Sequence, residues 1–280
     1  MKLLHTIQET RDEIARVRDE ARVIGFVPTM GALHKGHITL VKTAREQCDF
    51  VVVSIFVNPT QFGPNEDLAK YPRTLESDVR KCEDAGVDLV FAPSASEMYP
   101  EGFDSWVEVS GLTDVLEGAT RPGHFRGVTT VCAKLFGIVR PDLAFFGKKD
   151  YQQFVIIKNL ARELGLPLTI VPVDTVREHD GLAMSSRNVY LSSSERQAAL
   201  ALSRSLQLVK RSFDAGERRV RTLQSAAENM IEAEPLAKID CVAIVDAETL
   251  GPIETIERPA VLLLAVRIGS TRLIDNVVLG

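Results

Sequence analysis

The fold of this chain is decided at residues 23–41, which read Val23-Ile24-Gly25-Phe26-Val27-Pro28-Thr29-Met30-Gly31-Ala32-Leu33-His34-Lys35-Gly36-His37-Ile38-Thr39-Leu40-Val41. The apolar run closed by Pro28 predicts a buried strand, and Leu40 and Val41 open an apolar pattern at helical spacing. The helix is therefore expected to begin near Gly36, after a tight turn. Doubly wound α/β proteins use such a strand, turn and helix to hold nucleotides at the carboxyl edge of the sheet.

Two histidines, His34 and His37, stand at the expected start of this helix. Free backbone N–H groups and the positive end of the helix dipole favour an anion there, so phosphate is the expected ligand. A surface pair without function is the alternative, but Gly31 and Gly36 would let a ligand approach the backbone closely. A zinc site is disfavoured, because helical zinc ligands usually stand four residues apart and need a third ligand.

The composition is that of an ordinary soluble globular protein, with 280 residues, 45% hydrophobic and 25% charged. The formal net charge of −5 argues against a nucleic-acid partner and leaves only a local positive cluster for any phosphate site. No apolar run approaches the roughly 18 residues that cross a bilayer, and the charged amino terminus is unlike a signal peptide. Four cysteines lie far apart among apolar neighbours, which is typical of reduced thiols, so we expect a cytoplasmic protein without a membrane partner.

Strands alternate with helices in the first part of the chain, which predicts a parallel sheet with helices on both faces. Further strands are expected at 50–57, 89–92, 106–109, 143–146 and 168–173, and helices at 6–20, 74–85, 128–139 and 151–164. Thr74 is suited to cap the helix that follows it, and Leu75 is expected to face inward. Asp78 on the same helix is interpreted as solvent-exposed surface rather than as a metal ligand.

Polar residues follow two more of the expected strands, at the same sheet edge as the histidines. Asn58 before Pro59 suits ordinary turn chemistry, whereas Gln61 has no evident role in a turn. After the strand at 143–146 comes Gly147-Lys148-Lys149-Asp150, where a lysine can reach phosphate oxygens; a solvated lysine pair is the alternative. The loop at 121–127 is either a substrate lid or a basic turn.

The alternation of strands and helices stops near Ser192, where Ser192 and Glu195 predict a capping box. Helices expected at 195–213 and 218–233, then strands at 239–245, 260–268 and 273–279, indicate a smaller α+β domain. We therefore expect a Rossmann-like domain over 1–175 and a C-terminal α+β domain over 176–280. Met184-Ser185-Ser186-Arg187, near this boundary, offers hydroxyls and a guanidinium to phosphate oxygens.

Several motifs resemble those of known families. His34-Lys35-Gly36-His37 fits the H-x-G-H motif of the nucleotidyl-transfer superfamily of class I aminoacyl-tRNA synthetases and cytidylyltransferases, and Met184-Ser185-Ser186-Arg187 is similar to its second, mobile phosphate-binding loop. With residues 28–31, 58–62, 123–128 and 146–153, the chain resembles the pantothenate synthetase (pantoate–β-alanine ligase) family over essentially its whole length.

This resemblance implies an ATP-dependent condensation of (R)-pantoate with β-alanine to pantothenate. The family forms an enzyme-bound pantoyl adenylate and releases pyrophosphate and AMP. Mg²⁺ is expected to accompany the nucleotide, held mainly by phosphate oxygens, with any protein ligand unknown, and a homodimer is expected. The alternatives are a related H-x-G-H nucleotidylyltransferase and a non-catalytic nucleotide-sensing module.

Position by position, the resemblance also implies site residues. His37, His34, Lys149 and Arg187 are expected to be catalytic, and Gln61 and Gln153 to hold pantoate, with Gln61 also meeting β-alanine. The residues expected to bind ATP are Met30, Gly31, Ala32, Leu33, His34, Lys35, Gly36, His37, Gly147, Lys148, Lys149, Asp150, Val176, Met184, Ser185, Ser186 and Arg187. Lys148 departs from the family, which often has Glu or Gln there.

Overall fold

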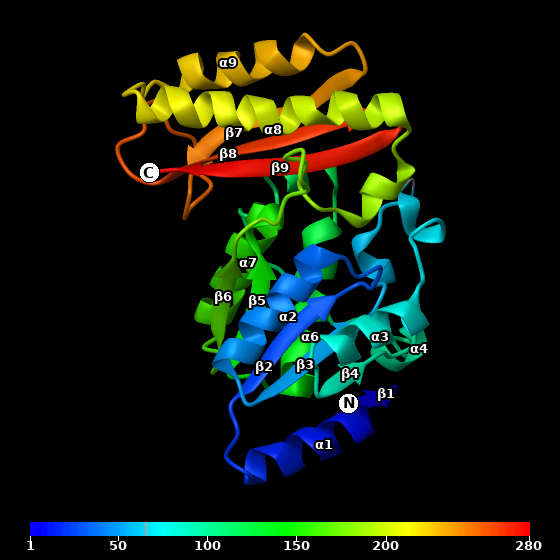
Figure 1. Ribbon diagram of the computed structural model, residues 1–280. Coiled ribbons are helices and arrows are strands. Elements are labelled where there is room, and N and C mark those ends of the chain that lie inside the picture. Colours follow the sequence, from blue (N-terminus) through cyan, green and yellow to red (C-terminus); the bar gives the residue numbers. More distant parts are fainter. Residues whose placement is uncertain (65) are drawn as a thin grey trace. The chain divides into compact units, whose positions relative to one another are not determined.

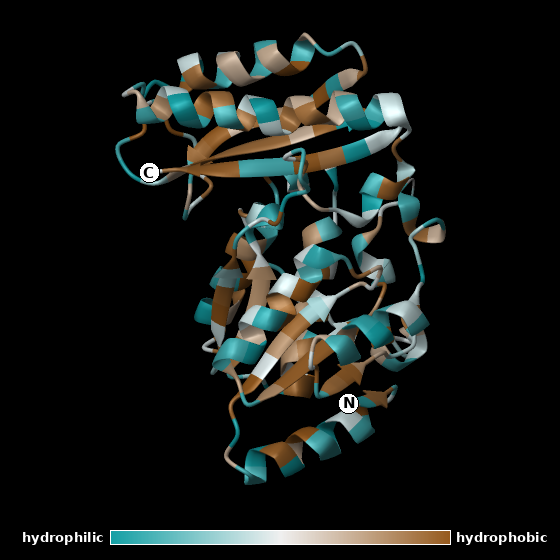
Figure 2. Ribbon diagram, in the orientation of Figure 1, coloured by the Kyte–Doolittle hydropathy of each residue, from teal (hydrophilic) through white to brown (hydrophobic). Residues whose placement is uncertain are grey.

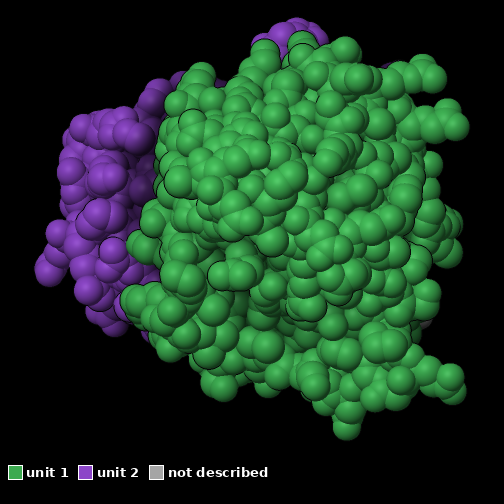
Figure 3. Space-filling model, turned by 90° about the horizontal axis from the view of Figure 1, so that it is seen from below, with its two compact units in different colours: residues 1–148, 156–174 green, residues 149–155, 175–280 purple. Residues whose placement is uncertain are grey.

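A computed structural model describes residues 1–64 and 66–280; Asn65, in the polar loop that follows the strand expected at 50–57, lies outside the described residues. The chain forms two compact units. Unit 1 comprises Met1–Lys148 and Ile156–Asp174, and unit 2 comprises Lys149–Val155 and Thr175–Gly280 (Figure 3). The expected domains divide after residue 175 and leave 149–155 in the first one, whereas the compact units divide after Asp174 and assign Lys149–Val155 to unit 2.

Unit 1 is built on a parallel sheet of six strands in the order β1-β4-β3-β2-β5-β6 (Figure 1). The strands are β1 (Lys2–Leu4), β2 (Ile24–Thr29), β3 (Phe50–Ile55), β4 (Leu89–Phe91), β5 (Leu143–Gly147) and β6 (Thr169–Val173). The central strands β2 and β3 are the apolar runs seen in the sequence, and every residue of β3 is buried. Such continuous burial is what a strand covered on both faces requires, and Figure 2 colours these strands as hydrophobic.

Helices cover both faces of this sheet. The helices between Ile7 and Glu163 are α1 (Ile7–Asp19), α2 (Lys35–Gln47), α3 (Leu75–Asp84), α4 (Ala95–Met98), α5 (Glu117–Thr120), α6 (His124–Val139) and α7 (Tyr151–Glu163), with 3₁₀ turns η1 (Pro59–Gln61), η2 (Asp67–Ala69) and η3 (Lys148–Asp150); residues 149–155 of η3 and α7 belong to unit 2. Leu40 of α2 and Cys82 of α3 pack with Val27 in one core cluster. Phe26, which points to the other face because strand side chains alternate, packs its ring against Phe136 of α6. The expected Rossmann-like architecture is confirmed.

The structure differs in four details from the elements that the sequence predicts. Strand β1 has only three residues, too few for a periodic pattern. The strand expected at 106–109 does not form, because the N–H of Val107 bonds to the side chain of Thr130 instead of to another strand. Thr74 occupies the N-cap position of α3 but makes no capping bond, and Leu75 is 38% exposed.

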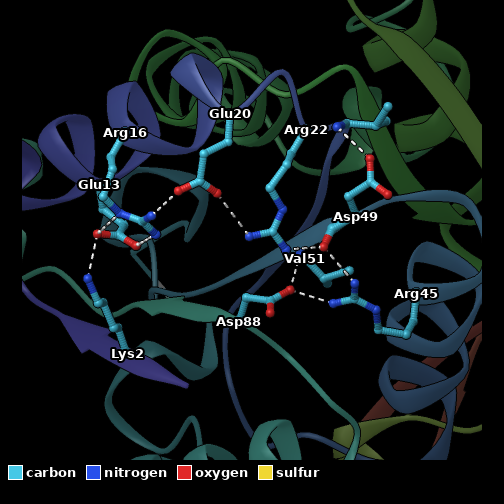
Figure 4. A network of polar contacts seen from close by, with 10 residues as sticks. Lys2, Glu13, Arg16, Glu20, Arg22, Arg45, Asp49, Val51 and Asp88 are labelled. Atoms are coloured by element: carbon cyan, nitrogen blue, oxygen red, sulfur yellow. Dashed lines mark hydrogen bonds and ion pairs between the residues drawn. The ribbon is translucent and has the colours of Figure 1, made fainter.

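The amino ends of the strands are closed by a polar network (Figure 4). Asp88 accepts the backbone N–H of Val51 at 2.8 Å and pairs with Arg45 of α2. Asp49 accepts the backbone N–H of Val23 at 2.9 Å. These contacts satisfy the first peptide groups of the strands at this edge. The turns that carry the candidate site residues of unit 1 lie at the other, carboxyl edge.

Unit 2 is an α+β unit, as expected. Its antiparallel sheet has the order β7-β8-β9, formed by β7 (Ala237–Asp246), β8 (Ala260–Ile268) and β9 (Thr271–Leu279), and its long helices are α8 (Ser193–Asp214) and α9 (Val220–Glu232), preceded by the 3₁₀ turn η4 (Ser186–Tyr190). Leu202 of α8 and Leu223 of α9 pack with Leu262 of β8 in one core. The predicted capping box is confirmed: Ser192 and Glu195 exchange side chain to backbone hydrogen bonds at the start of α8.

None of the helices in the described part of the chain combines the length and hydrophobicity that crossing a membrane needs.

Candidate functional site

The turn from β2 into α2 carries two histidines that cap the helix together. His34 is the N-cap residue, and its Nδ1 accepts the backbone N–H of Gly36 at 3.1 Å. Nδ1 of His37 accepts the backbone N–H of His34 at 3.3 Å, and the ring centroids lie 4.2 Å apart. Because each Nδ1 accepts a hydrogen bond, the proton of each neutral ring is on Nε2. Both imidazoles therefore carry a donor at the positive end of a helix.

A buried carboxylate holds the backbone of this turn. Asp78 of α3 is fully buried, and its two oxygens accept the backbone N–H groups of Ala32 and Leu33, each at 2.8 Å. The hydroxyl of Thr74 donates to it at 2.9 Å. The turn needs this support because Ala32 has φ of +50°, a conformation that side chains with a Cβ disfavour. The interpretation of Asp78 as exposed surface was wrong, since this side of α3 faces the turn and not solvent.

Gln61 lies in η1, just beyond the carboxyl end of β3, and is only 8% exposed. Its Oε1 accepts from Nδ2 of Asn58 at 3.0 Å, and its Nε2 donates toward the sulfur of Met30 at 3.1 Å. The amide is therefore held with its NH₂ group away from Asn58, and an NH₂ group is a donor for substrate oxygens. Asn58 does cap η1, as turn chemistry predicts, but it also orients Gln61.

Tyr99 completes this arrangement and was not anticipated from the sequence. Its hydroxyl donates to Oδ1 of Asn58 at 2.8 Å, so the Asn58 amide is fixed at both ends. Burial raises the pKa of Tyr99, which keeps the phenol protonated and able to donate. No local pattern marks Tyr99 in the sequence, because its partner is 41 residues away.

The segment 121–127 braces the backbone of the Gln61 turn, and it is not wholly a loop as expected, because α6 begins at His124 and not at residue 128. Arg121 forms a two-point ion pair with Glu66, with both N–O distances 2.7 Å, and donates from Nη1 to Nε2 of His124 at 2.9 Å. The Nδ1–H of His124 then donates to the backbone oxygen of Gln61 at 2.8 Å. Burial, and next the charge of Arg121, lowers the pKa of His124 from 6.5 to about 4, so the ring is neutral near pH 7. These residues are therefore more than a basic turn, because Arg121 and His124 hold the backbone at Gln61.

Close packing brings α6 against the same turn. A Cβ added at Gly127 would lie 2.3 Å from the backbone oxygen of Thr60, so only glycine fits. The oxygen of Gly127 accepts from Asn58 at 3.1 Å.

Unit 1 also contains Gly147 and Lys148, at the carboxyl end of β5. Nζ of Lys148 lies 2.6 Å from the Asp174 carboxylate, so its charge is balanced within unit 1. This pairing distinguishes Lys148 from its neighbour Lys149, although the sequence presents them as a pair.

Unit 2 contains the other candidate residues. Lys149 and Asp150 belong to η3, where Nζ of Lys149 lies 3.7 Å from the Asp150 carboxylate, and Gln153 lies in the first turn of α7. Val176 and Met184 are joined by a backbone hydrogen bond of 3.0 Å, at the open end of a short hairpin. Ser185 caps η4 by accepting the N–H of Arg187 at 3.2 Å, and Ser186 follows it.

Groups that can donate hydrogen bonds to anions thus dominate the candidate residues of unit 1 and those of unit 2. Within residues 1–64 and 66–280, no group of three or more His, Cys, Asp or Glu side chains could hold a metal ion. The chemistry that these residues suit is the binding of phosphate oxygens and a second oxygen-rich substrate, beside an oriented amide.

Comparison with known proteins gives a consistent result. The sequence pattern of the family described as pantoate-beta-alanine ligase matches residues 2–278. Proteins named pantothenate synthetase from Moorella thermoacetica and Heliobacterium modesticaldum are 56% and 57% identical over 279 and 278 residues, covering 99–100% of this chain and 99% of each relative.

Solved structures agree as well. The crystal structure of pantothenate synthetase from Thermus thermophilus is 48% identical, with a TM-score of 0.94 over 99% of both chains. Pantoate-beta-alanine ligase from Francisella tularensis, solved in complex with beta-gamma ATP and beta-alanine, is 35% identical, with a TM-score of 0.80 over 99% of this chain and 97% of that one.

Proposed function

The chain belongs to the pantoate-beta-alanine ligase family, and from this premise we propose how its side chains divide the reaction. The protein is an AMP-forming ligase that condenses (R)-pantoate with β-alanine, using ATP and passing through an enzyme-bound pantoyl adenylate. A carboxylate is a poor acyl donor, so it must first acquire a good leaving group.

In the first half-reaction a carboxylate oxygen of pantoate attacks the α-phosphorus of ATP. An O–P bond forms, the bond to the β-phosphate oxygen breaks, and pyrophosphate leaves with the bonding electrons. Negative charge grows on the phosphates, so fixed donors stabilise the transition state. We assign this role to the Nε2–H groups of His34 and His37, to the ammonium group of Lys149 and to the guanidinium of Arg187.

The nucleotide contacts are assigned stretch by stretch. In unit 1 they are Met30–His37, Gly147 and Lys148, and in unit 2 they are Lys149, Asp150, Val176 and Met184–Arg187. Support comes from the positive end of α2 and from the hydroxyls of Ser185 and Ser186, which can donate to phosphate oxygens. The side chain of Lys148 is paired with Asp174, so its part is expected to be limited to the backbone.

Pantoate is assigned to Gln61 and Gln153, and β-alanine to the neighbourhood of Gln61. An amide donor suits a hydroxyl or a carboxylate oxygen. In the second half-reaction the β-alanine amine attacks the acyl carbon, the C–N bond forms, and AMP leaves with the electrons of the broken C–O bond.

Magnesium, the homodimer and the location are further parts of this proposal. Asp150 is the one carboxylate among the residues assigned to ATP, and a single carboxylate fits an Mg²⁺ ion that arrives with the nucleotide and keeps phosphate and water ligands. The ion would neutralise charge on the leaving pyrophosphate. We also propose a homodimer, and a cytoplasmic location consistent with four cysteines that lie far apart in the sequence and with ATP as a substrate.

The observation that carries the site assignment is the pair of imidazoles whose Nδ1 atoms are both engaged at the start of α2. The test is to incubate the protein with ATP, Mg²⁺ and D-pantoate, with and without β-alanine. Pyrophosphate release should require ATP and pantoate, and rapid AMP release should require β-alanine as well. Pyrophosphate release with a phosphorylated acceptor in place of pantoate would indicate a nucleotidylyltransferase, and no turnover would indicate a nucleotide sensor.

A further inference from the structure

Two adjacent polar residues interrupt the apolar sequence of strand β9. Asp275 is 2% exposed and Asn276 is 6% exposed, whereas Leu273, Ile274 and Val277 around them are apolar. Burying polar groups costs free energy unless each finds a hydrogen-bond partner. The partners that these two residues have found belong to the two segments of unit 2 that we assign to ATP.

Asn276 holds the segment that carries Lys149. Its Nδ2 donates to the backbone oxygen of Lys149 at 2.8 Å. This bond fixes the peptide group that follows the Cα of Lys149, and so it limits the directions in which the Lys149 side chain can leave the backbone. The segment is part of unit 2 although Lys148 before it belongs to unit 1, so contacts such as this one keep it there.

Asp275 holds the hairpin from Val176 to Met184. Its two carboxylate oxygens accept from Nη1 and Nη2 of Arg177 at 2.6 and 2.9 Å. Nη1 of Arg177 also donates to the oxygen of Gly181 at 3.0 Å, across the hairpin turn. A bidentate pair with a buried carboxylate has a fixed geometry, so the open end of the hairpin, where Val176 meets Met184, is fixed too.

The two contacts lie on opposite faces of β9, because successive strand side chains alternate. They are also joined, since the backbone N–H of Asn276 donates to Oδ1 of Asp275 at 2.8 Å. A displacement of β9 would therefore move both ATP segments together.

We propose that Asp275 and Asn276 are positioning residues for ATP: they set Lys149 and the Met184–Arg187 segment in the relative arrangement that adenylation requires. This inference rests on the proposed assignment of those segments to the nucleotide. Neither residue touches the reacting atoms in this scheme.

The test compares Asn276→Ala with Val278→Ala, which changes the same face of the same strand two residues further on. Asn276→Ala should raise the KM for ATP in pyrophosphate release on the order of 10-fold and lower the single-turnover adenylation rate by a similar factor, as small misplacements of charged groups do. The KM for β-alanine, measured on preformed pantoyl adenylate, should not change. Asp275→Asn should act in the same direction, and urea unfolding of each variant establishes that it is folded.

A double-mutant cycle separates this inference from the assignment of Lys149. If Asn276 acts through Lys149, Asn276→Ala should have little effect on adenylation in a Lys149→Ala background. If the effects of Asn276→Ala and Lys149→Ala on adenylation were fully additive, the positioning role alone would be overturned. The same would follow if Lys149→Ala were impaired while folded Asn276→Ala kept an unchanged KM for ATP. Normal adenylation by Lys149→Ala would instead overturn the assignment of Lys149, and with it the premise of this inference.

Discussion

At the scale of single residues, hydrogen bonds determine what each side chain can offer a substrate. The imidazoles of His34 and His37 accept hydrogen bonds at Nδ1 in the helix cap, which places the ring proton of each on Nε2. The oxygen of the Gln61 amide accepts from Asn58, and its NH₂ group, which donates toward the sulfur of Met30, is the donor end of the amide. Imidazole and amide side chains can each either donate or accept a hydrogen bond, and in both cases a hydrogen bond within the protein determines which atom is the donor.

We expect His37→Ala and Lys149→Ala each to lower pantoyl-adenylate formation by on the order of 10²-fold or more, the usual effect of removing a preorganised donor from developing charge. Single-turnover release of pyrophosphate measures this. His5→Ala and Lys158→Ala are the controls, since His5 bonds to the oxygen of Ala92 and Lys158 is exposed on α7. Unchanged adenylation in both test variants would refute the assignment.

The low pKa of His124 predicts a pH dependence of stability. The unfolded chain takes up a proton at His124 near pH 6.5, whereas the folded chain does so only near pH 4. The neutral form therefore stabilises the fold fully above pH 6.5, and this contribution is lost as pH falls from 6.5 toward 4, with a slope of up to about 1.4 kcal/mol per pH unit. Urea unfolding between pH 7 and pH 4.5 should show a steeper loss in the native chain than in His124→Gln. Equal slopes would contradict the prediction.

At the scale of elements, the site depends on how closely neighbouring elements approach. Helix α3 supplies Asp78 to the turn before α2, and α6 comes so near to η1 that a Cβ at Gly127 would overlap the oxygen of Thr60. Each contact joins segments far apart in the sequence. The turns of unit 1 are therefore held by helices that themselves carry none of the residues assigned to ATP or pantoate.

Two glycines of α6 provide a matched test of this approach. Gly127→Ala should destabilise the fold by about 1–3 kcal/mol through overpacking, and it should raise the KM for pantoate because the Gln61 turn must shift. Gly137→Ala, in the same helix, meets nothing within 4 Å and should stabilise the fold by about 0.5–1 kcal/mol. Urea unfolding and pantoate titration of both variants measure the two effects. A Gly127→Ala variant as active and stable as Gly137→Ala would rule out the close contact.

At the scale of the whole molecule, each unit has its own core and its own share of the residues assigned to ATP. The formal charge of −5 means that anionic substrates are bound by local donors and not by a basic surface.

The proposed homodimer belongs to this scale. Light scattering at micromolar concentration should give a mass of about twice the 30.8 kDa of one chain. A mass of one chain at that concentration would dismiss the dimer. The mass should not depend on ATP or pantoate if the interface lies apart from the substrates.

The sequence by itself determined the parallel sheet, the helices on both faces, the α+β arrangement after Ser192 and the family, because periodicity, capping residues and short motifs are local signals. Strand β1 gave too short a pattern to be recognised. Only the tertiary structure decided that Asp78 is buried beneath a turn, that His124 is a neutral brace for Gln61, and that Asn276 holds Lys149. Those roles depend on partners 45 to 127 residues away in the chain, and a side chain's partners are set by packing, which no local pattern records.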